Sequence, residues 1–507
     1  MSIIKIPLAN KNLSDILVAL GAGAALPLAF APFDFAVLAI LSPSLLFLLW
    51  RRGSPWRCFG VGLAFGLGSF GVGVSWVYRS MHDYGGMSVP LAALAVALFV
   101  LLLSLFPALV GGLQARFGDR KRVAHLIVVL PALWVLLEWC RSWVLTGFPW
   151  LSLGYSQIDT PLSGVASGFG IYAVSLSVAL VAGLLALIID KPRRPWPALV
   201  LVGVFGLGFL LGRIEWVEPK GPMIKVALVQ GNVPLDMKWS PRYRMTVAER
   251  YLHLSQEYRD QDLIVWPEVA IPAFKDQIPP SFWRELKNES TQYQTDFLYG
   301  TLERRQGADG ALDYYNVVRS IASQPQTYHK HHLVPFGEYL PFPVLTRWLM
   351  GALDIPMSDF SPWPDADGVM HVAGQAVAVS ICYEDAFPEE FIRLLPEATL
   401  LVNVSEDAWF GDSLGPLQRL QMARMRALET GRTLLRVANT GVTAIINHRG
   451  KIIAHTEQFK TVVLSGEVQP MQGATPYVRW GNKAVLMLIG GMLVLGWVGS
   501  WGLSRKA

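Results

Sequence analysis

Residues 376–385 read Ala376-Val-Ala-Val-Ser-Ile-Cys-Tyr-Glu-Asp385, an apolar run that reaches a cysteine and then turns polar. The length and composition of the run are typical of a short buried strand. The end of a strand, where it opens into a loop, is where α/β enzymes place catalytic groups. We therefore interpret Cys382 as a candidate nucleophile, with a small buried core residue as the alternative.

The sequence around this strand alternates strand-like and helix-like segments from about residue 222 to residue 470. Strand patterns occur at 225–230, 262–266, 297–301, 317–321, 376–382 and 399–404, and 436–446 and 461–467 are expected to form a late antiparallel set around a turn at 448–451. Helix patterns occur at 242–260, 281–294, 388–396 and 414–430. This alternation predicts an α/β domain built around sheets.

The rest of the chain is far more apolar than a soluble domain. Hydrophobic residues make up 52% of the 507 residues and charged residues only 16%, against roughly 25% charged in soluble domains. This composition excludes a disordered chain and disfavours a wholly soluble one. Apolar runs of the length that crosses a bilayer occur at 14–33, 35–50, 58–78, 88–113, 124–145, 164–189, 197–214 and 483–503. We expect a polytopic helical membrane bundle of about eight spans, with a bundle domain at 1–216, an exported domain at 217–475, and a last span with a basic tail at 476–507.

The basic residues between these runs predict the orientation of the bundle. With the exported domain left aside, fourteen Lys and Arg residues fall on the side of the N-terminus, and only Arg79, Arg141 and Arg213 fall on the other side. Basic loops stay in the cytoplasm, so we expect both termini to be cytoplasmic and the α/β domain to lie outside. A cleaved signal peptide ending near Ala29-Phe30-Ala31 is the alternative for the first run.

A nucleophilic thiol needs a base and a nearby cation. Glu268 follows the strand pattern at 262–266, and Lys330 lies in a His-rich stretch. Read singly, each of these residues would be interpreted as a surface charge. Cys382 is the only cysteine of the expected exported domain, whereas Cys58 and Cys140 lie in apolar runs and are interpreted as packing residues. The three cysteines are too scattered for a disulfide scaffold or a zinc site.

Together these stretches carry a resemblance. Trp266-Pro-Glu268, Lys330 with Pro335-Phe-Gly-Glu338, and Cys382-Tyr-Glu384 resemble the Glu-Lys-Cys triad of the nitrilase superfamily. Further motifs are similar to those of the apolipoprotein N-acyltransferase family: Val229-Gln-Gly-Asn232, Lys238-Trp239, His332-Leu-Val-Pro-Phe-Gly-Glu338, Asp407-Ala-Trp-Phe-Gly411 and Ala423-Arg-Met-Arg-Ala-Leu-Glu429. Two positions depart from that pattern, because Glu406 stands where Asn is common and Arg419 where His is common. We expect these departures to affect only local details of a loop and of the helix at 414–430.

The resemblance implies a four-layer αββα sandwich on a membrane bundle in the bacterial inner membrane. It implies transfer of an acyl chain from a phospholipid, expected to be phosphatidylethanolamine, onto Cys382. The chain then passes to the α-amine of the diacylglyceryl-cysteine of an apolipoprotein. Glu268 would be the general base and Lys330 the cation near the oxyanion. Glu338, Tyr383 and Glu384 would support the site. No cofactor, metal or nucleic acid is implied.

Four further residues are candidates for binding substrate: Trp239, Asn316, Trp150 and Trp348. Residues 342–364 are rich in apolar side chains, and we interpret them as a lid that touches lipid or as an ordinary packed helix. The aromatic stretch at 146–155 is interpreted as an interfacial connector or as part of a lipid-facing cavity.

Two other functions compete with the acyltransferase at this stage. A membrane-anchored nitrilase-type amidase acting on a small C–N substrate would use the same triad, but it would need one anchor rather than eight spans. A transporter or receptor would carry polar groups within the spans. Glu138 and Arg141 are the main such residues, and we interpret them as a structural pair at i, i+3.

Overall fold

The computed structural model describes residues 11–117, 123–307, 310–339, 341, 360–364 and 367–504. As described, the chain divides into two compact units. Unit 1 is Met1–Tyr78, Val89–Ile214 and Asn482–Ala507, and unit 2 is Arg79–Ser88 and Glu215–Gly481. Glu268, Lys330 and Cys382 all belong to unit 2.

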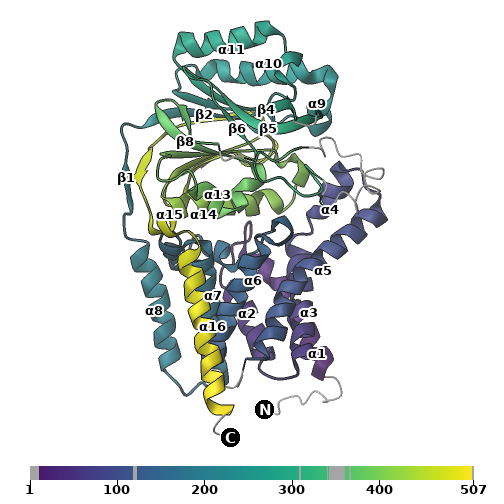
Figure 1. Cartoon of the computed structure of the whole chain (residues 1–507), viewed down its shortest axis with the longest axis vertical. Coiled ribbons are helices and arrows are strands. Elements are labelled where there is room, and N and C mark those ends of the chain that lie inside the picture. Colours follow the sequence, from purple (N-terminus) through teal and green to yellow (C-terminus); the bar gives the residue numbers. More distant parts are fainter. Residues whose placement is uncertain are drawn as a thin grey trace. The chain divides into compact units, whose positions relative to one another are not determined.

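Unit 1 is helical (Figure 1). Its main helices are α1 (Lys11–Ala25), α2 (Leu38–Leu49), α3 (Pro55–Gly73), α5 (Val89–Gln114), α6 (Leu130–Arg141), α7 (Val165–Asp190), α8 (Trp196–Leu211) and α16 (Lys483–Ser504). Within the described residues, three segments are helical, long and apolar enough to cross a membrane: Asn12–Ala29, Val89–Gln114 and Pro161–Asp190. The pair Pro55–Gly73 and Val77–Tyr84, bent by 61°, would be a fourth. A helical region with candidate membrane spans is therefore confirmed, whereas the count of eight stays a prediction.

The helices of unit 1 differ in what surrounds them. Helix α7 is largely buried among its neighbours, whereas α5 and α8 expose rows of leucine and valine. Exposed apolar rows of this kind suit contact with lipid rather than water. Helix α3 approaches α5 closely, since a Cβ atom at Gly66 would lie 2.6 Å from the Cα of Ser104. Small residues at such crossings are typical of membrane bundles.

Glu138 and Arg141 on α6 both anchor the aromatic stretch at 146–155. The Glu138 carboxylate accepts hydrogen bonds from the indole of Trp134 (2.8 Å) and from the backbone N–H of Leu153 (3.0 Å). Arg141 donates to the carbonyl oxygen of Phe148 at 2.7 Å. These contacts fit a structural role for both residues, because their side chains hold the backbone of the stretch that follows the helix.

In the described part of unit 2, twelve of the strands form two six-stranded sheets. The first sheet contains, in spatial order, β13 (Val462–Val468), β2 (Ile224–Gln230), β3 (Leu263–Val265), β4 (Asp296–Gln306), β5 (Leu312–Ile321) and β6 (Thr327–His329). The second contains β12 (Ile452–His455), β11 (Ala444–Ile446), β10 (Thr433–Ala438), β9 (Leu400–Ser405), β8 (Gln375–Ile381) and β7 (Met370–Val372). A short pair, β1 (Val217–Pro219) and β14 (Met471–Gly473), completes the unit.

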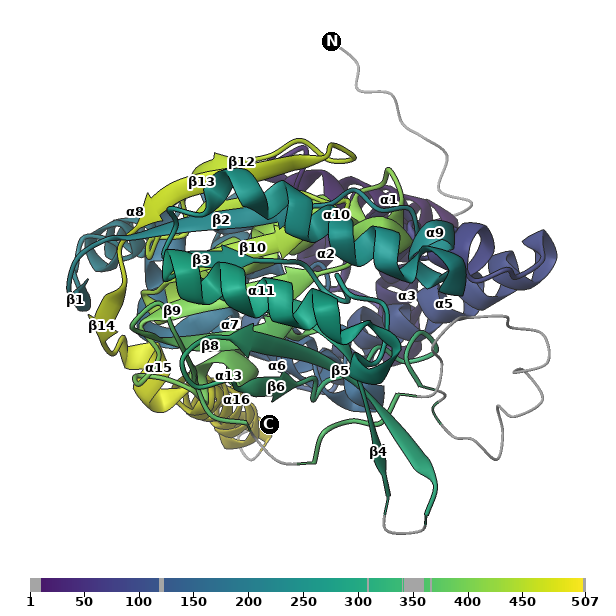
Figure 2. The same cartoon turned by 90° about the horizontal axis from the view of Figure 1, so that it is seen from above.

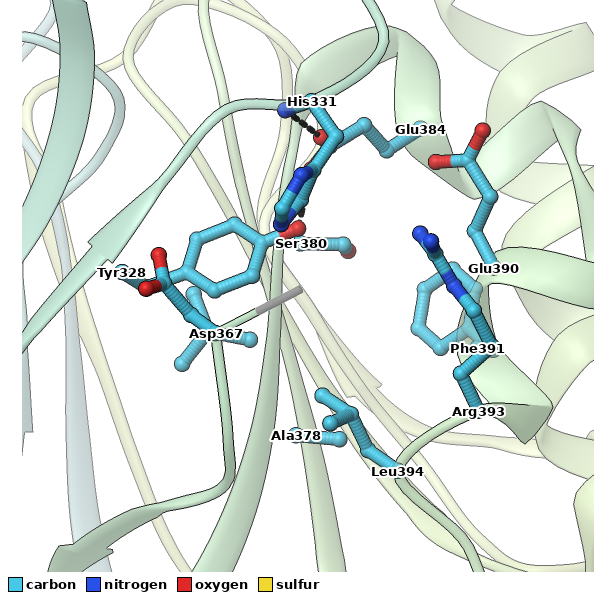
Figure 3. A pocket seen from close by; sticks show the side chains of 11 residues that line it. Tyr328, His331, Asp367, Ala378, Ser380, Glu384, Glu390, Phe391, Arg393 and Leu394 are labelled. Atoms are coloured by element: carbon cyan, nitrogen blue, oxygen red, sulfur yellow. Dashed lines mark hydrogen bonds between the residues drawn. The ribbon is translucent and has the colours of Figure 1, made fainter. Parts of the chain in front are cut away.

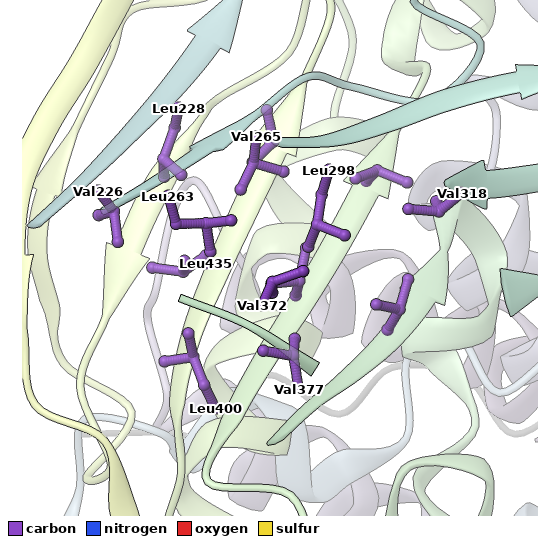
Figure 4. Close-up of a cluster of buried hydrophobic side chains, with 14 of the residues drawn as sticks. Val226, Leu228, Leu263, Val265, Leu298, Val318, Val372, Val377, Leu400 and Leu435 are labelled. Atoms are coloured by element: carbon purple, nitrogen blue, oxygen red, sulfur yellow. The ribbon is translucent and has the colours of Figure 1, made fainter. Parts of the chain in front are cut away.

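The two sheets face each other across one apolar core. Alternate residues of a strand point to opposite faces of a sheet. In β2, Val226 and Leu228 therefore join the core between the sheets, which Figure 4 shows, while Ala227 and Val229 face the helical layer. Strands buried on both faces read as nearly continuous apolar runs, which is why these segments were visible in the sequence.

Helices cover the outer face of each sheet (Figures 1 and 2). Helices α10 (Arg244–Ser255) and α11 (Pro280–Tyr293) lie over the first sheet, and α13 (Pro388–Ile392) and α14 (Gly415–Thr430) lie over the second. Unit 2 thus has the αββα layers that the resemblance implied.

The expected late antiparallel set is confirmed in part, since β10, β11 and β12 pair in antiparallel order with a turn at 448–451. It is wrong in two respects. Residues 436–446 are not one strand, because β10 ends at Ala438 and β11 begins at Ala444. β10 pairs with β9 in parallel, and β13 pairs with β2 in the other sheet. The turn between β10 and β11 is buried, and the Ala438 N–H donates to the Thr443 hydroxyl across it at 3.1 Å. Because this turn is buried, the sequence pattern did not distinguish it from a strand that continues from β10 to β11.

Candidate active site

Both sheets contribute residues to one buried site through the ends of their strands. Glu268 follows β3 and Lys330 follows β6 in the first sheet, while Cys382 follows β8 in the second. A direct contact joins the two sheets here, since the backbone N–H of Glu406, just after β9, donates to Glu268 Oε2 at 2.7 Å. The sequence-predicted triad residues are therefore brought into one site, and all three are at least nine-tenths buried.

Cys382 has an unusual backbone conformation. Its φ angle is +53°, in the left-handed region that non-glycine residues rarely adopt. Its carbonyl oxygen is held by Arg419 Nη2 at 2.6 Å and by Asn403 Nδ2 at 3.3 Å. Strained conformations persist only where the surroundings enforce them, and they gather at functional sites. The β8 end thus presents this thiol from a fixed turn, Cys382–Ala386.

Glu268 and Lys330 lie in a chain of buried charges. Lys330 Nζ is 2.7 Å from Glu338 Oε1 and 3.4 Å from Glu268 Oε1. Asn316 on β5 donates to both carboxylates, at 2.7 Å to Glu268 and at 3.3 Å to Glu338. One ammonium and one amide thus hold two carboxylates in place.

These contacts set the protonation of the site. Burial raises the pKa of Glu268, but Lys330, Asn316 and Lys238 outweigh it, so that the pKa lies below its usual value and the carboxylate is ionised at neutral pH. Burial and the neighbouring Glu268 raise the pKa of the Cys382 thiol to about 12. A protonated thiol beside an ionised carboxylate is the starting arrangement for general-base catalysis.

Glu384 fastens the turn of Cys382 to the segment that carries Lys330. Its carboxylate accepts from the backbone N–H groups of Ile381 (2.6 Å) and His331 (2.8 Å), and from the hydroxyl of Tyr328 (2.9 Å). Burial raises the pKa of Glu384 to about 7, with Glu390 adding to the effect. Tyr383, the next residue after the thiol, is buried against His332 and Phe387.

Glu384 also lines a small pocket (Figure 3). Its described lining includes His331, Asp367, Glu384 and Arg393, but none of the triad side chains. The pocket therefore does not coincide with the site of Cys382. Among the residues that the structure describes, no three His, Cys, Asp or Glu side chains are grouped to hold a metal ion.

Both departures from the family pattern contact triad residues, which corrects the expectation that they change only local details. Glu406 pairs with Lys238, whose ammonium also donates to the Glu268 carbonyl at 2.8 Å. Arg419 lies 3.5 Å from Cys382 Sγ. The reason is topological, because β8 and β9 are adjacent parallel strands whose carboxyl ends meet at one edge.

The candidate substrate-binding residues differ in where they lie. Asn316 is part of the site itself. Trp239 ends the short helix α9 (Leu235–Trp239) directly after Lys238, and its indole N–H is buried with no partner among the described residues. Trp150 belongs to unit 1, where it is fully buried and stacks on Phe148 at 4.8 Å. Trp348 and most of the expected lid lie outside the described residues.

The fold and the site define a protein of the carbon–nitrogen hydrolase class, and residues 225–477 match the family model described as carbon-nitrogen hydrolase. Residues 22–184 match the model of the apolipoprotein N-acyltransferase N-terminal domain. The apolipoprotein N-acyltransferase of Methylococcus capsulatus is 44% identical over 94% of this chain and 95% of its own length. That of Nitrosomonas europaea is 44% identical over 97% and 98%. The chain belongs to the apolipoprotein N-acyltransferase family.

Solved structures are similar to about half of this chain. A nitrilase-superfamily protein of Saccharomyces cerevisiae has a TM-score of 0.37 at 18% identity, covering 54% of this chain and 96% of its own. A carbon-nitrogen hydrolase from Helicobacter pylori has a TM-score of 0.36 at 15% identity, covering 56% and 96%. A membrane-anchored hydrolase of small C–N compounds is not favoured, because the match to curated relatives runs through the helical region as well.

Proposed function

We propose that this chain transfers a fatty acyl chain from a phospholipid to the α-amino group of the N-terminal diacylglyceryl-cysteine of apolipoproteins. The reaction proceeds through a thioester on Cys382. The observation that carries the proposal is the buried convergence of Glu268, Lys330 and Cys382 in a chain of this family. An enzyme that used the same three residues on a soluble substrate would not need the apolar helices of unit 1.

In the first half-reaction, Glu268 removes the proton from Cys382 and the thiolate attacks the ester carbonyl of the phospholipid. Negative charge then develops on the carbonyl oxygen, where Lys330 and the backbone N–H of Tyr383 stabilise it. A preset donor at such an oxygen contributes roughly 10²–10³ in rate. The carbon–oxygen bond breaks, and the protonated Glu268 returns its proton to the glycerol oxygen that leaves as a lysophospholipid.

In the second half-reaction, the α-amine of the acceptor attacks the thioester. An α-amino group has a pKa of roughly 7.7–8.0, so a useful fraction is neutral and nucleophilic at physiological pH. Glu268 takes a proton from the attacking nitrogen, the carbon–sulfur bond breaks, and the departing thiolate of Cys382 recovers its proton. Two sequential half-reactions of this kind give ping-pong kinetics.

The surrounding residues support these steps. Glu338 orients Lys330 through their 2.7 Å contact, and Asn316 orients both carboxylates. Glu384 holds the segment after Lys330 next to the turn of Cys382, because its carboxylate accepts hydrogen bonds from both. The unpartnered indole N–H of Trp239 and the unpartnered Oδ1 of Asn316, both judged among the described residues, are a donor and an acceptor that a bound substrate would use.

The membrane arrangement is part of the same proposal. Both substrates are lipids, and moving an acyl chain into water costs about 0.8 kcal/mol per CH₂. The thiol must therefore meet its substrates at the bilayer surface. Eight spans, cytoplasmic termini and an extracytoplasmic unit 2 in the inner membrane agree with the distribution of Lys and Arg.

A transfer assay tests the proposal. The detergent-purified protein is incubated with phosphatidylethanolamine and a synthetic diacylglyceryl lipopeptide, and the lipopeptide is weighed by mass spectrometry. We expect a fatty-acyl increment on the α-amine with the wild type and none with Cys382→Ala or Glu268→Gln. Phosphatidylglycerol in place of phosphatidylethanolamine tests the donor. An N-acetylated lipopeptide that still gains the acyl chain would contradict the assigned acceptor.

A further inference from the structure

Arg419 on α14 is a buried cation in direct contact with the sulfur of Cys382. Its Nη1 lies 3.5 Å from Sγ, and its Nη2 donates to the carbonyl oxygen of the same residue at 2.6 Å. The side chain is fully buried. A guanidinium stays protonated at all accessible pH values, and the carboxylates around Arg419 raise its pKa further. The thiol therefore has a permanent positive charge beside it.

The position of this guanidinium is fixed from two sides. Asp407 Oδ1 accepts from Nη1 at 2.7 Å, and Asp385 Oδ2 accepts from Nη2 at 2.8 Å. The hydroxyl of Ser405 accepts from Nη1 at 2.6 Å. These partners come from the ends of β8 and β9, so Arg419 is held against the sulfur by the same strands that present it.

We propose that Arg419 is a further catalytic residue, which stabilises the thiolate of Cys382 when Glu268 removes its proton and again when the acyl group leaves it. The inference rests on the proposed function for its place in the reaction. Lys330 then acts mainly at the carbonyl oxygen, and Arg419 acts at the sulfur. In support, Arg419 lowers the pKa of the Cys382 thiol more strongly than Lys330 does.

The test measures the reactivity of the thiol without any lipid substrate. All variants carry Cys58→Ala and Cys140→Ala, so that iodoacetamide reports on Cys382, and intact mass follows alkylation at pH 8. Because no transfer reaction is needed, failure of the acyltransferase proposal would leave this result readable. The thiolate is the species that reacts.

Arg419→Gln should slow the alkylation. An opposite charge at this distance changes the thiolate fraction by roughly 10- to 1000-fold. The nucleophilicity of a thiolate rises with its basicity and offsets about half of this effect on a logarithmic scale, which leaves a slowing of roughly 3- to 30-fold. Arg419→Lys keeps the charge and should restore most of the rate.

A matched control separates the charge from a structural role. Arg432 is equally buried in unit 2, but it donates to the backbone carbonyls of Ala398 and Gly473. Arg432→Gln should leave the alkylation rate of the folded protein unchanged. If Arg419→Gln reacts as fast as the parent, or if Arg432→Gln slows the reaction equally, the inference is overturned.

A variant that is expected to speed up the alkylation, rather than to slow it, keeps the inference testable if Arg419→Gln fails to fold. Asp407 offsets the charge of Arg419 and raises the pKa of the Cys382 thiol. Asp407→Asn keeps the size of the side chain and removes its charge. Alkylation of Cys382 should then become faster, and an unchanged or slower reaction would overturn the inference.

Discussion

Replacing Lys330 by methionine removes a buried cation that two carboxylates share. Its ammonium nitrogen lies 2.7 Å from Glu338 and 3.4 Å from Glu268. Methionine has a similar length and carries no charge, so the substitution leaves both carboxylates buried without their common partner. One of them should take up a proton to restore neutrality, because an unpaired buried charge is far more costly than a neutral acid.

The structure gives the size of the effect. At an effective dielectric constant of about 20, a charge pair at 3.4 Å contributes roughly 4–5 kcal/mol. Without Lys330, the effect of burial on Glu268 is less opposed and the pKa of this carboxyl rises, so a part of the base is protonated at neutral pH. The oxyanion also loses a donor, a loss of about 10²–10³ in rate. We expect acyl-enzyme formation to slow by at least about 10²-fold at pH 7.5, and by less at pH 9, where Glu268 is ionised again.

The assay is the time course of acyl-enzyme formation from phosphatidylethanolamine, followed by intact mass in a single turnover at both pH values. Lys287→Met is the matched control, since Lys287 is exposed on the outer face of α11. If Lys330→Met formed acyl-enzyme as fast as Lys287→Met, the reasoning about this cation would be refuted.

Three further results are expected. Glu338→Gln should slow acyl-enzyme formation by about tenfold or more in the same time course, because a hydrogen bond to a charged group contributes roughly 1.5–3 kcal/mol. An unchanged rate would mean that Glu338 does not hold Lys330. The rate in the wild type should fall as the pH drops through about 7, where Glu384 gains a proton and can no longer accept from all its donors. Glu384→Gln should be slow at every pH, and a variant that keeps the wild-type pH profile would contradict this assignment. Leu298→Ala, in the core between the sheets, should lower the free energy of unfolding of unit 2 by about 2–5 kcal/mol in chemical denaturation, with the rate per folded molecule unchanged; a loss of rate at full stability would contradict a purely structural role.

The sequence predicted those site residues that can be recognised from the short stretch of chain around them. Cys382 and Glu268 each follow a short apolar strand, and both strands are present close to the expected positions. The α/β character of unit 2 also followed from the sequence, since the alternation of strands and helices is a property of neighbouring residues, whereas its four layers were implied by the family resemblance. Lys330 carried a weaker signal, and only the set of motifs distinguished it from a surface charge.

The residues that the sequence did not predict depend on which strands are neighbours. Arg419 lies 37 residues beyond Cys382, and it contacts the sulfur because α14 packs on the sheet where β8 and β9 end together. Lys238 and Glu406 meet through the contact between the two sheets. No periodicity or composition specifies the order of strands in a sheet. Residues 436–446 were interpreted as one stretch for another reason, because the turn between β10 and β11 is buried.

The most direct test of the whole account is the chemical state of Cys382 after exposure to a phospholipid alone. The detergent-purified protein is incubated with phosphatidylethanolamine beside Cys382→Ala, and both are weighed intact. We expect a fatty-acyl mass increment on the wild type only, which peptide mapping locates at Cys382 and hydroxylamine removes, as it cleaves a thioester. A folded wild-type protein that converts the lipopeptide but never carries this adduct would contradict the central claim that the acyl chain passes through Cys382.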